Sequence, residues 1–154
     1  MAHLIRLFLL SLLLLMAMNS HAQKSFSVYG ELLGNGLNAS VNIDYRLNSN
    51  KNGIGVRLGY ALGSDINLIG MVNYLIGSEK HKLEVGAGVM NISRMLNDNI
   101  LIENISKGLK LTGSVVYRYH ADSGFLFRIG WTPIVADNSE TLRFWLGTSV
   151  GWRF

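Results

Sequence analysis

Apolar and polar residues alternate one by one along most of the chain beyond its N-terminal segment. In 37–47 every odd-numbered residue is apolar or aromatic apart from the small Ala39, and every even-numbered residue is polar. Successive side chains of a β-strand point to opposite faces, so this period of two predicts a strand with one apolar and one polar face. A helix with the same sequence would scatter its apolar residues around the circumference.

The same alternation recurs often enough to predict eight strands. The other seven stretches are 26–33, 54–62, 66–76, 82–89, 109–119, 125–132 and 142–154. The stretch 66–76 is the weakest, because Ile69, Met71 and Leu75 stand on its otherwise polar face. Strands of roughly ten residues have the length that a tilted strand needs to cross a bilayer.

The connections between these strands are of two kinds. Short ones rich in turn-forming residues lie at 48–52, 77–81 and 120–124, and the longest lie near 91–108 and 134–141. The first connection, Gly34-Asn35-Gly36, is very tight, although it would lie on the same side of the barrel as the two longest loops. If the first strand starts in the periplasm, the three short turns are periplasmic and the two longest loops lie outside.

The two faces of the predicted strands differ in charge. The apolar face carries no Asp, Glu, Lys or Arg, and an Arg or Lys on a lipid-facing strand position costs about 2–4 kcal/mol at the bilayer midplane. The interior of an eight-stranded barrel is just wide enough for side chains to fill it, so the inward charges are expected to pair across the lumen. The predicted lumen charges are Glu31, Asp44, Arg46, Arg57, Glu84, Arg118, Arg128 and Arg143.

Alternation and charge alone fit a soluble β-sandwich equally well, because its apolar faces meet each other and its charged faces meet water. The aromatic residues favour a membrane barrel instead. They fall toward the two ends of the strands, as Tyr45, Tyr117 and Trp152 do at one end and Tyr60 and Trp131 do at the other. Two such belts are typical of the two interfaces of a membrane.

The N-terminal segment has the pattern of a cleavable signal peptide. Arg6 supplies a positive charge, 7–18 is an apolar run, and the small residues Ser20 and Ala22 predict cleavage between Ala22 and Gln23. An apolar helix of this length reaches about 18 Å, too short for a hydrocarbon core of roughly 30 Å. The expected division is a signal peptide at 1–22 and a β-barrel at 23–154.

The last residues repeat the alternation and end on an aromatic ring. Phe154, Trp152 and Val150 resemble the carboxy-terminal signal that the barrel assembly machinery reads in outer-membrane barrels, although Ser149 stands where a glycine is usual. The whole mature chain resembles small eight-stranded barrels of the outer-membrane protein A and X type. That resemblance implies an all-β, antiparallel, up-and-down transmembrane barrel in the outer membrane of a Gram-negative-type bacterium, with membrane lipid and lipopolysaccharide around it.

Composition narrows the chemistry further. Charged residues make up 16% of the chain, and the net charge of +4 is scattered, so nucleic acid is not an expected partner. The chain has no Cys, which excludes disulfides and thiolate metal sites. The mature chain keeps only His81 and His120, both in expected periplasmic turns, so no catalytic, metal or cofactor residue is predicted.

One connection is unusually apolar for a solvated loop. The segment 92–107, which begins at Ile92 and ends at Lys107, either forms a hairpin above the membrane that offers an edge to a surface partner or simply lengthens the two strands that flank it.

Three functions follow from these patterns. The first is a non-enzymatic outer-membrane barrel with a role in envelope integrity or surface interaction. The second is a barrel enzyme that modifies lipid A, by analogy with similar barrels. The third is a soluble periplasmic β-sandwich or barrel that carries a ligand.

Overall fold

The structure, a computed structural model, describes residues 25–47, 52–62, 67–92, 107–135 and 144–154. The predicted signal peptide with its cleavage site at Ala22 and Gln23 lies outside the described residues, and so does Arg143. In the described ranges no helix is long and apolar enough to cross a membrane.

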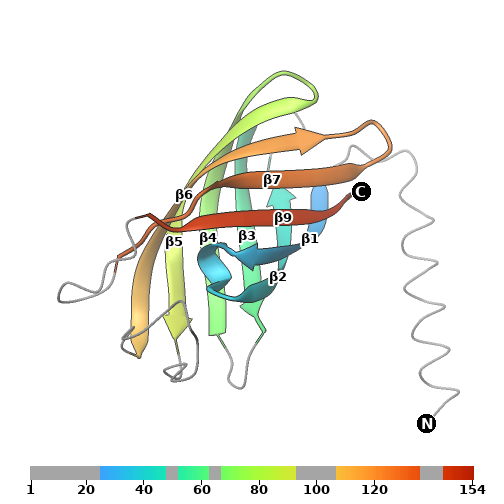
Figure 1. Cartoon of the computed structure of the whole chain (residues 1–154). Coiled ribbons are helices and arrows are strands. Elements are labelled where there is room, and N and C mark those ends of the chain that lie inside the picture. Colours follow the sequence, from blue (N-terminus) through green and yellow to red (C-terminus); the bar gives the residue numbers. More distant parts are fainter. Residues whose placement is uncertain (1–24, 48–51, 63–66, 93–106, 136–143) are drawn as a thin grey trace, which may run out of the picture.

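Nine strand segments and one 3-10 turn make up the described part of the chain (Figure 1). In chain order they are β1 (Phe26–Leu33), η1 (Gly34–Gly36), β2 (Ala39–Arg46), β3 (Gly53–Ala61), β4 (Asn67–Gly77), β5 (His81–Ile92), β6 (Gly108–His120), β7 (Phe125–Trp131), β8 (Ile134–Val135) and β9 (Leu146–Arg153).

These segments form one closed antiparallel barrel of eight strands. Each strand pairs with its neighbours in the chain, and β1 closes the ring by pairing with β9, where Val28 lies opposite Trp152. Segments β7 and β8 both pair with β6 and together make the seventh barrel strand, which the Thr132–Pro133 pair interrupts. The predicted all-β, eight-stranded, up-and-down barrel is confirmed as a fold.

Pro133 explains the interruption, because proline has no N–H to donate to the neighbouring strand. Its carbonyl still accepts a hydrogen bond of 3.0 Å from the backbone N–H of Gly113. The chain therefore returns to the sheet for Ile134 and Val135, which lie in β8 and not in the loop predicted to start at 134.

The alternating residues face the two sides of the wall as predicted. Arg57 and Glu84 point inward and are 0% exposed. The outward side chains are exposed, and the four that a β-sandwich would bury between its sheets have exposed fractions of 46%, 56%, 42% and 62% for Val41, Leu58, Val85 and Leu111. A barrel with its charges inside and its apolar residues outside is thus the observed arrangement.

The connection between β1 and β2 departs from the prediction of a tight outer turn. It folds into the lumen as η1, and Gly34, Asn35 and Gly36 are all buried. Leu33 and Leu37 on either side of it have positive φ angles of 60° and 67°. A left-handed backbone costs a residue with a side chain about 1–3 kcal/mol, so contacts inside the barrel must hold this turn in place.

Two hydrogen bonds from distant parts of the barrel hold η1. The Asn35 side-chain amide donates to Thr112 Oγ1 at 2.6 Å, and the Trp145 indole donates to the Gly34 carbonyl at 2.7 Å. The positive φ of Leu37 also turns its side chain inward, where it is 3% exposed. The prediction that Leu37 lies on the outward apolar face was therefore wrong.

Leu37 belongs to an apolar cluster that fills the lumen beside η1, with Trp145 packed against it. The other members are Ile69, Met71, Met90, Ile92 and Ile134. This cluster explains the apolar residues on the inner face of β4, which weakened the alternation there. At the start of the segment 92–107, Ile92 is the last residue of β5 and its side chain is 3% exposed in the lumen. Residues 93–106 lie outside the described part, so the expected contact with a surface partner stays a prediction.

The last strand begins later than the predicted 142. Strand β9 starts at Leu146, Phe144 lies in a turn with 94% of its surface exposed, and Leu142 lies outside the described residues. Strand β9 then runs to Arg153.

Gly151 allows β9 and β1 to approach each other at the closing seam. A Cβ atom on Gly151 would lie 2.1 Å from the Val28 carbonyl oxygen, whereas a Cβ on Gly70 in β4 would have no atom within 4 Å. We expect Gly151→Ala to destabilise the barrel by about 1–3 kcal/mol, because the backbone must shift, and Gly70→Ala to leave it unchanged. Urea unfolding of the refolded proteins checks this, and equal midpoints for the two variants would show that the seam is not tightly packed.

Candidate functional site

The centre of the lumen holds seven of the eight predicted charges. They come from six strands and form one connected set, which we call the lumen network: Glu31, Asp44, Arg46, Arg57, Glu84, Arg118 and Arg128. All seven side chains are buried.

The half of the network near η1 centres on the Glu31 carboxylate. This carboxylate pairs with the Arg57 guanidinium, and its other oxygen lies 3.5 Å from Arg128 Nη1. The Ser40 hydroxyl also donates to Glu31 at 3.3 Å. Glu31 therefore lies between two guanidinium groups.

The other half repeats this arrangement twice. Glu84 lies 2.5 Å from Arg128 Nη2 and 2.9 Å from Arg118 Nη1. Asp44 pairs with Arg118 and lies 2.6 Å from Arg46 Nη2. The network is therefore a single chain in which four guanidiniums alternate with three carboxylates.

Neutral polar side chains accept further hydrogen bonds from the arginines, whereas among the described residues the buried Nε of Arg46 has no acceptor. Asn42 accepts from Arg57 Nε at 2.9 Å, Asn35 accepts from Arg57 Nη1 at 2.9 Å, and Asn73 accepts from Arg46 Nη2 at 2.5 Å. Asn35 also donates to Thr112 on β6, so this one side chain connects η1 both to the lumen network and to the barrel wall. The alternation placed Asn42 and Asn73 on the inner face but gave no sign of the partners they take.

Tyr29 adds an aromatic ring to the network. Its ring centroid lies 4.5 Å from the guanidinium carbon of Arg128 and 5.5 Å from that of Arg57. A cation over an aromatic face is attracted by about 0.5–2 kcal/mol, more when water is excluded. Sequence reasoning put Tyr29 on the inner face but did not identify this contact, because ring geometry depends on the diameter of the barrel.

The energetic consequence of this arrangement is rigidity. An unpaired buried charge is costly, whereas a charge with partners on both sides and satisfied hydrogen bonds is tolerated. Each carboxylate here has two positive neighbours, so the loss of one carboxylate takes a buried partner from two guanidinium groups at once. The lumen network can therefore hold the wall strands together, and it fills the space that a solute would need.

The two histidines lie on opposite sides of the wall. His120 is the last residue of β6, points inward, and accepts from Arg118 Nε at 2.7 Å. His81 is the first residue of β5, lies on the outside, and has its Nδ1 2.6 Å from the Tyr117 hydroxyl. Both histidines therefore lie at strand ends, whereas the sequence analysis expected them in turns.

The hydroxyl and carboxyl groups beside the histidines serve the turns. The Ser78 hydroxyl donates to the backbone carbonyl of His81 and not to its ring. Asp122 lies 2.5 Å from Lys80 Nζ, and this hydrogen bond raises the pKa of the Lys80 ammonium group. Among the described residues no group of three or more His, Asp or Glu side chains could hold a metal ion.

The terminal residues lie at the seam of the barrel. The Phe154 N–H donates to the Phe26 carbonyl at 2.7 Å, and the two rings lie 6.3 Å apart. Trp152 and Val150 point outward from β9 with exposed fractions of 43% and 55%. Recognition of these three residues by an assembly machinery stays a prediction.

The pairing of the strands and the charge-lined lumen define a closed, eight-stranded antiparallel β-barrel. A solved structure with this fold is the N-terminal β-barrel domain of OprF from Pseudomonas aeruginosa, with a TM-score of 0.56 and 14% sequence identity over 84% of this chain and 96% of that chain. No family model matches the chain, and no curated protein is significantly similar to it in sequence. The predicted resemblance to small outer-membrane barrels is confirmed for the fold.

Removal of one network charge tests the rigidity of the lumen. We expect Glu84→Gln to lower the free energy of unfolding by about 3–5 kcal/mol, because Arg118 and Arg128 each lose a buried partner. The control is Asp122→Asn, which breaks the exposed pair with Lys80 and should leave the urea midpoint unchanged. Equal midpoints for Glu84→Gln and the parent protein would contradict a stabilising role for the lumen network.

Proposed function

We propose that this chain is a non-enzymatic outer-membrane barrel with a structural role in the cell envelope. The proposal rests above all on one observation: the outward face of the barrel is apolar on every strand while the charges are buried in the lumen. Soluble monomers rarely expose a contiguous apolar patch larger than a few hundred Å². Hydrocarbon is the surrounding that would make such a surface stable.

The aromatic residues support the same placement. Outward rings at one end of the barrel include Phe26, Tyr45, Tyr117 and Trp152, and those at the other end include Tyr60 and Trp131. Tyr and Trp are favoured at both interfaces of a bilayer. Because Phe26, Phe154 and the turns that follow β4 and β6 lie at the first of these ends, that end is the periplasmic one in the proposed orientation.

The closed lumen supports a structural role over a conduit. The lumen network fills the middle of the barrel, and η1 with its apolar cluster fills the space beside it. The proposal includes export with cleavage between Ala22 and Gln23, assembly through the aromatic end at Phe154, and contact with phospholipid and lipopolysaccharide. The segment 92–107 stays a predicted contact for a surface partner.

The two alternative functions make different demands on the barrel. A lipid A-modifying enzyme needs a nucleophile within reach of a base, and the ring of His81 has Tyr117 and Tyr119 as its neighbours. A ligand carrier needs an open apolar lumen. No observation on the described residues favours either alternative function.

Cell fractionation tests the location. We expect the full chain, expressed with its own N-terminus in a Gram-negative host, to appear in the outer-membrane fraction and to start at Gln23. The barrel should also migrate faster on a detergent gel before heating than after it, because a closed barrel resists unfolding by the detergent. Recovery as a soluble periplasmic protein would contradict the proposal.

A charge on the outer face tests the surrounding more directly. We expect Val72→Arg, in the middle of β4, to destabilise the vesicle-inserted barrel by about 2–4 kcal/mol. Leu47→Arg, one residue beyond the end of β2, should cost about 0–1 kcal/mol, since the cost depends on depth in the bilayer. Both parent side chains are exposed, with fractions of 57% and 63%. Urea titration in vesicles measures the two costs, and two small, equal costs would mean that water surrounds this face.

A further inference from the structure

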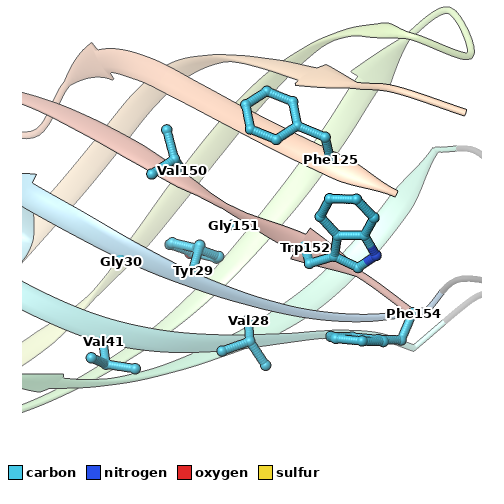
Figure 2. Close-up of a pocket in the computed structure, with 9 residues that line it drawn as sticks. All are labelled: Val28, Tyr29, Gly30, Val41, Phe125, Val150, Gly151, Trp152 and Phe154. Atoms are coloured by element: carbon cyan, nitrogen blue, oxygen red, sulfur yellow. The ribbon is translucent and has the colours of Figure 1, made fainter. Parts of the chain in front are cut away.

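The outer face of the barrel carries an apolar groove that lies outside the lumen network. Figure 2 shows its lining residues over the seam of β1 and β9. Its volume is about 520 Å³. The residues that define it for this argument are Val28, Gly30, Val41, Val150, Trp152 and Phe154. The groove lies in the half of the barrel that contains Phe125 and Phe154.

A missing side chain creates the floor of the groove. Gly30 faces outward between Val41 on β2 and Val150 on β9, and a Cβ atom placed on Gly30 would have no heavy atom within 4 Å. The flanking valines stand on either side of this gap in Figure 2. The barrel wall is therefore hollowed by one residue at this position.

Aromatic rings line the end of the groove that is nearest to Phe154. Trp152, Phe125 and Phe154 line it there, and Figure 2 shows the Trp152 indole with its nitrogen on the side toward Phe154. Trp152 Nε1 packs so closely on Gly124 that a Cβ on that glycine would lie 2.6 Å away. The β6–β7 turn thus holds the indole in place with its N–H near the end of the strands.

We propose that this groove binds one acyl chain of a phospholipid from the periplasmic leaflet, with the polar part of the lipid beside Trp152. The inference rests on the proposed function, because only a barrel in a membrane presents this face to lipid. A void against a protein surface forfeits dispersion contacts on one side, so a single chain lying along the Gly30 gap is favoured over an empty gap. The indole N–H supplies a donor for a lipid oxygen at the depth where tryptophan is favoured.

The position of the groove selects the kind of lipid. The groove lies toward Phe154 and Phe26, the end assigned to the periplasm, so the chain it meets belongs to a phospholipid and not to the lipopolysaccharide of the other leaflet. A gap of one side chain between valines has room for a single hydrocarbon chain, whereas a strand of a second copy would bring its own side chains into the gap.

The chain offers a matched pair of variants for the test. Gly30→Leu places a side chain in the groove, and Gly70→Leu makes the same change on the outer face away from the groove; at both glycines an added Cβ would have no heavy atom within 4 Å. Both variants carry Trp131→Phe, which leaves Trp152 as the outward tryptophan and Trp145 as a lumen reference. The probe is phosphatidylethanolamine with bromine on its acyl chain, which quenches tryptophan on contact.

In detergent micelles we expect the brominated lipid to quench Trp152 in a saturable phase that ends at one lipid per barrel. Gly70→Leu should keep this phase and Gly30→Leu should lose it. Equal, unsaturable quenching in both variants would overturn the inference, as would displacement of the probe by lipid A but not by unlabelled phosphatidylethanolamine. A dimer that Gly30→Leu converts to a monomer would also overturn it, because the occupant would be a second copy.

Insertion into phosphatidylcholine vesicles separates this inference from the proposed function. A barrel that inserts but shows no saturable quenching agrees with the proposed function and contradicts lipid binding in the groove. A barrel that stays monodisperse in buffer without detergent contradicts the proposed function itself.

Discussion

The chain of alternating charges in the lumen is the interaction on which the rest of the structure depends. Four guanidiniums and three carboxylates from six strands form a continuous series, and each carboxylate touches two guanidiniums. Buried charges of this kind need partners, because the cost of an unpaired ion in an apolar surrounding is several kcal/mol. The series therefore joins strands that lie across the lumen from one another, and it keeps its charges away from the mostly apolar outer face. The membrane placement proposed here follows from this separation, because a barrel with its charges inside exposes an apolar outer face that hydrocarbon can surround.

The turn η1 is the second constraint, and it acts through the first. Asn35 binds both Arg57 in the network and Thr112 on β6, which brings a strained turn into the lumen. The apolar cluster around Leu37 and Ile69 then packs beside the turn with Trp145 against it. Strain at Leu33 and Leu37 is thus offset by contacts that only a closed barrel can supply. One consequence is a lumen filled by polar groups in the middle and by apolar groups toward η1.

The alternation was sufficient to predict the strands, their faces and the identity of the inward charges. Successive side chains of a strand point to opposite faces, so the order of residues alone assigns each one to a face. The absence of charged residues from one face can likewise be read from each strand by itself. The pairing of Glu31 with Arg57, or of Tyr29 with Arg128, depends on barrel diameter and strand register, which no local pattern contains. Leu37 was misplaced because a positive φ reverses the alternation at one residue, and Ile134 was misplaced because Pro133 interrupts its strand without ending it. The glycines Gly34 and Gly36 were a signal for an unusual turn, but they did not reveal that it folds inward.

The central claim is that hydrocarbon surrounds the outward side chains, and a spin-label scan along β5 tests it most directly. The chain has no native Cys, so single cysteines at Leu83, Val85, Ala87 and Val89 can each carry a nitroxide, with Ser78 in the adjacent turn as the aqueous reference. In vesicles the account predicts high accessibility to oxygen and low accessibility to a water-soluble nickel chelate at all four positions, with the contrast largest at Val85 and Ala87. Nickel accessibility at these positions equal to that at Ser78 would contradict it.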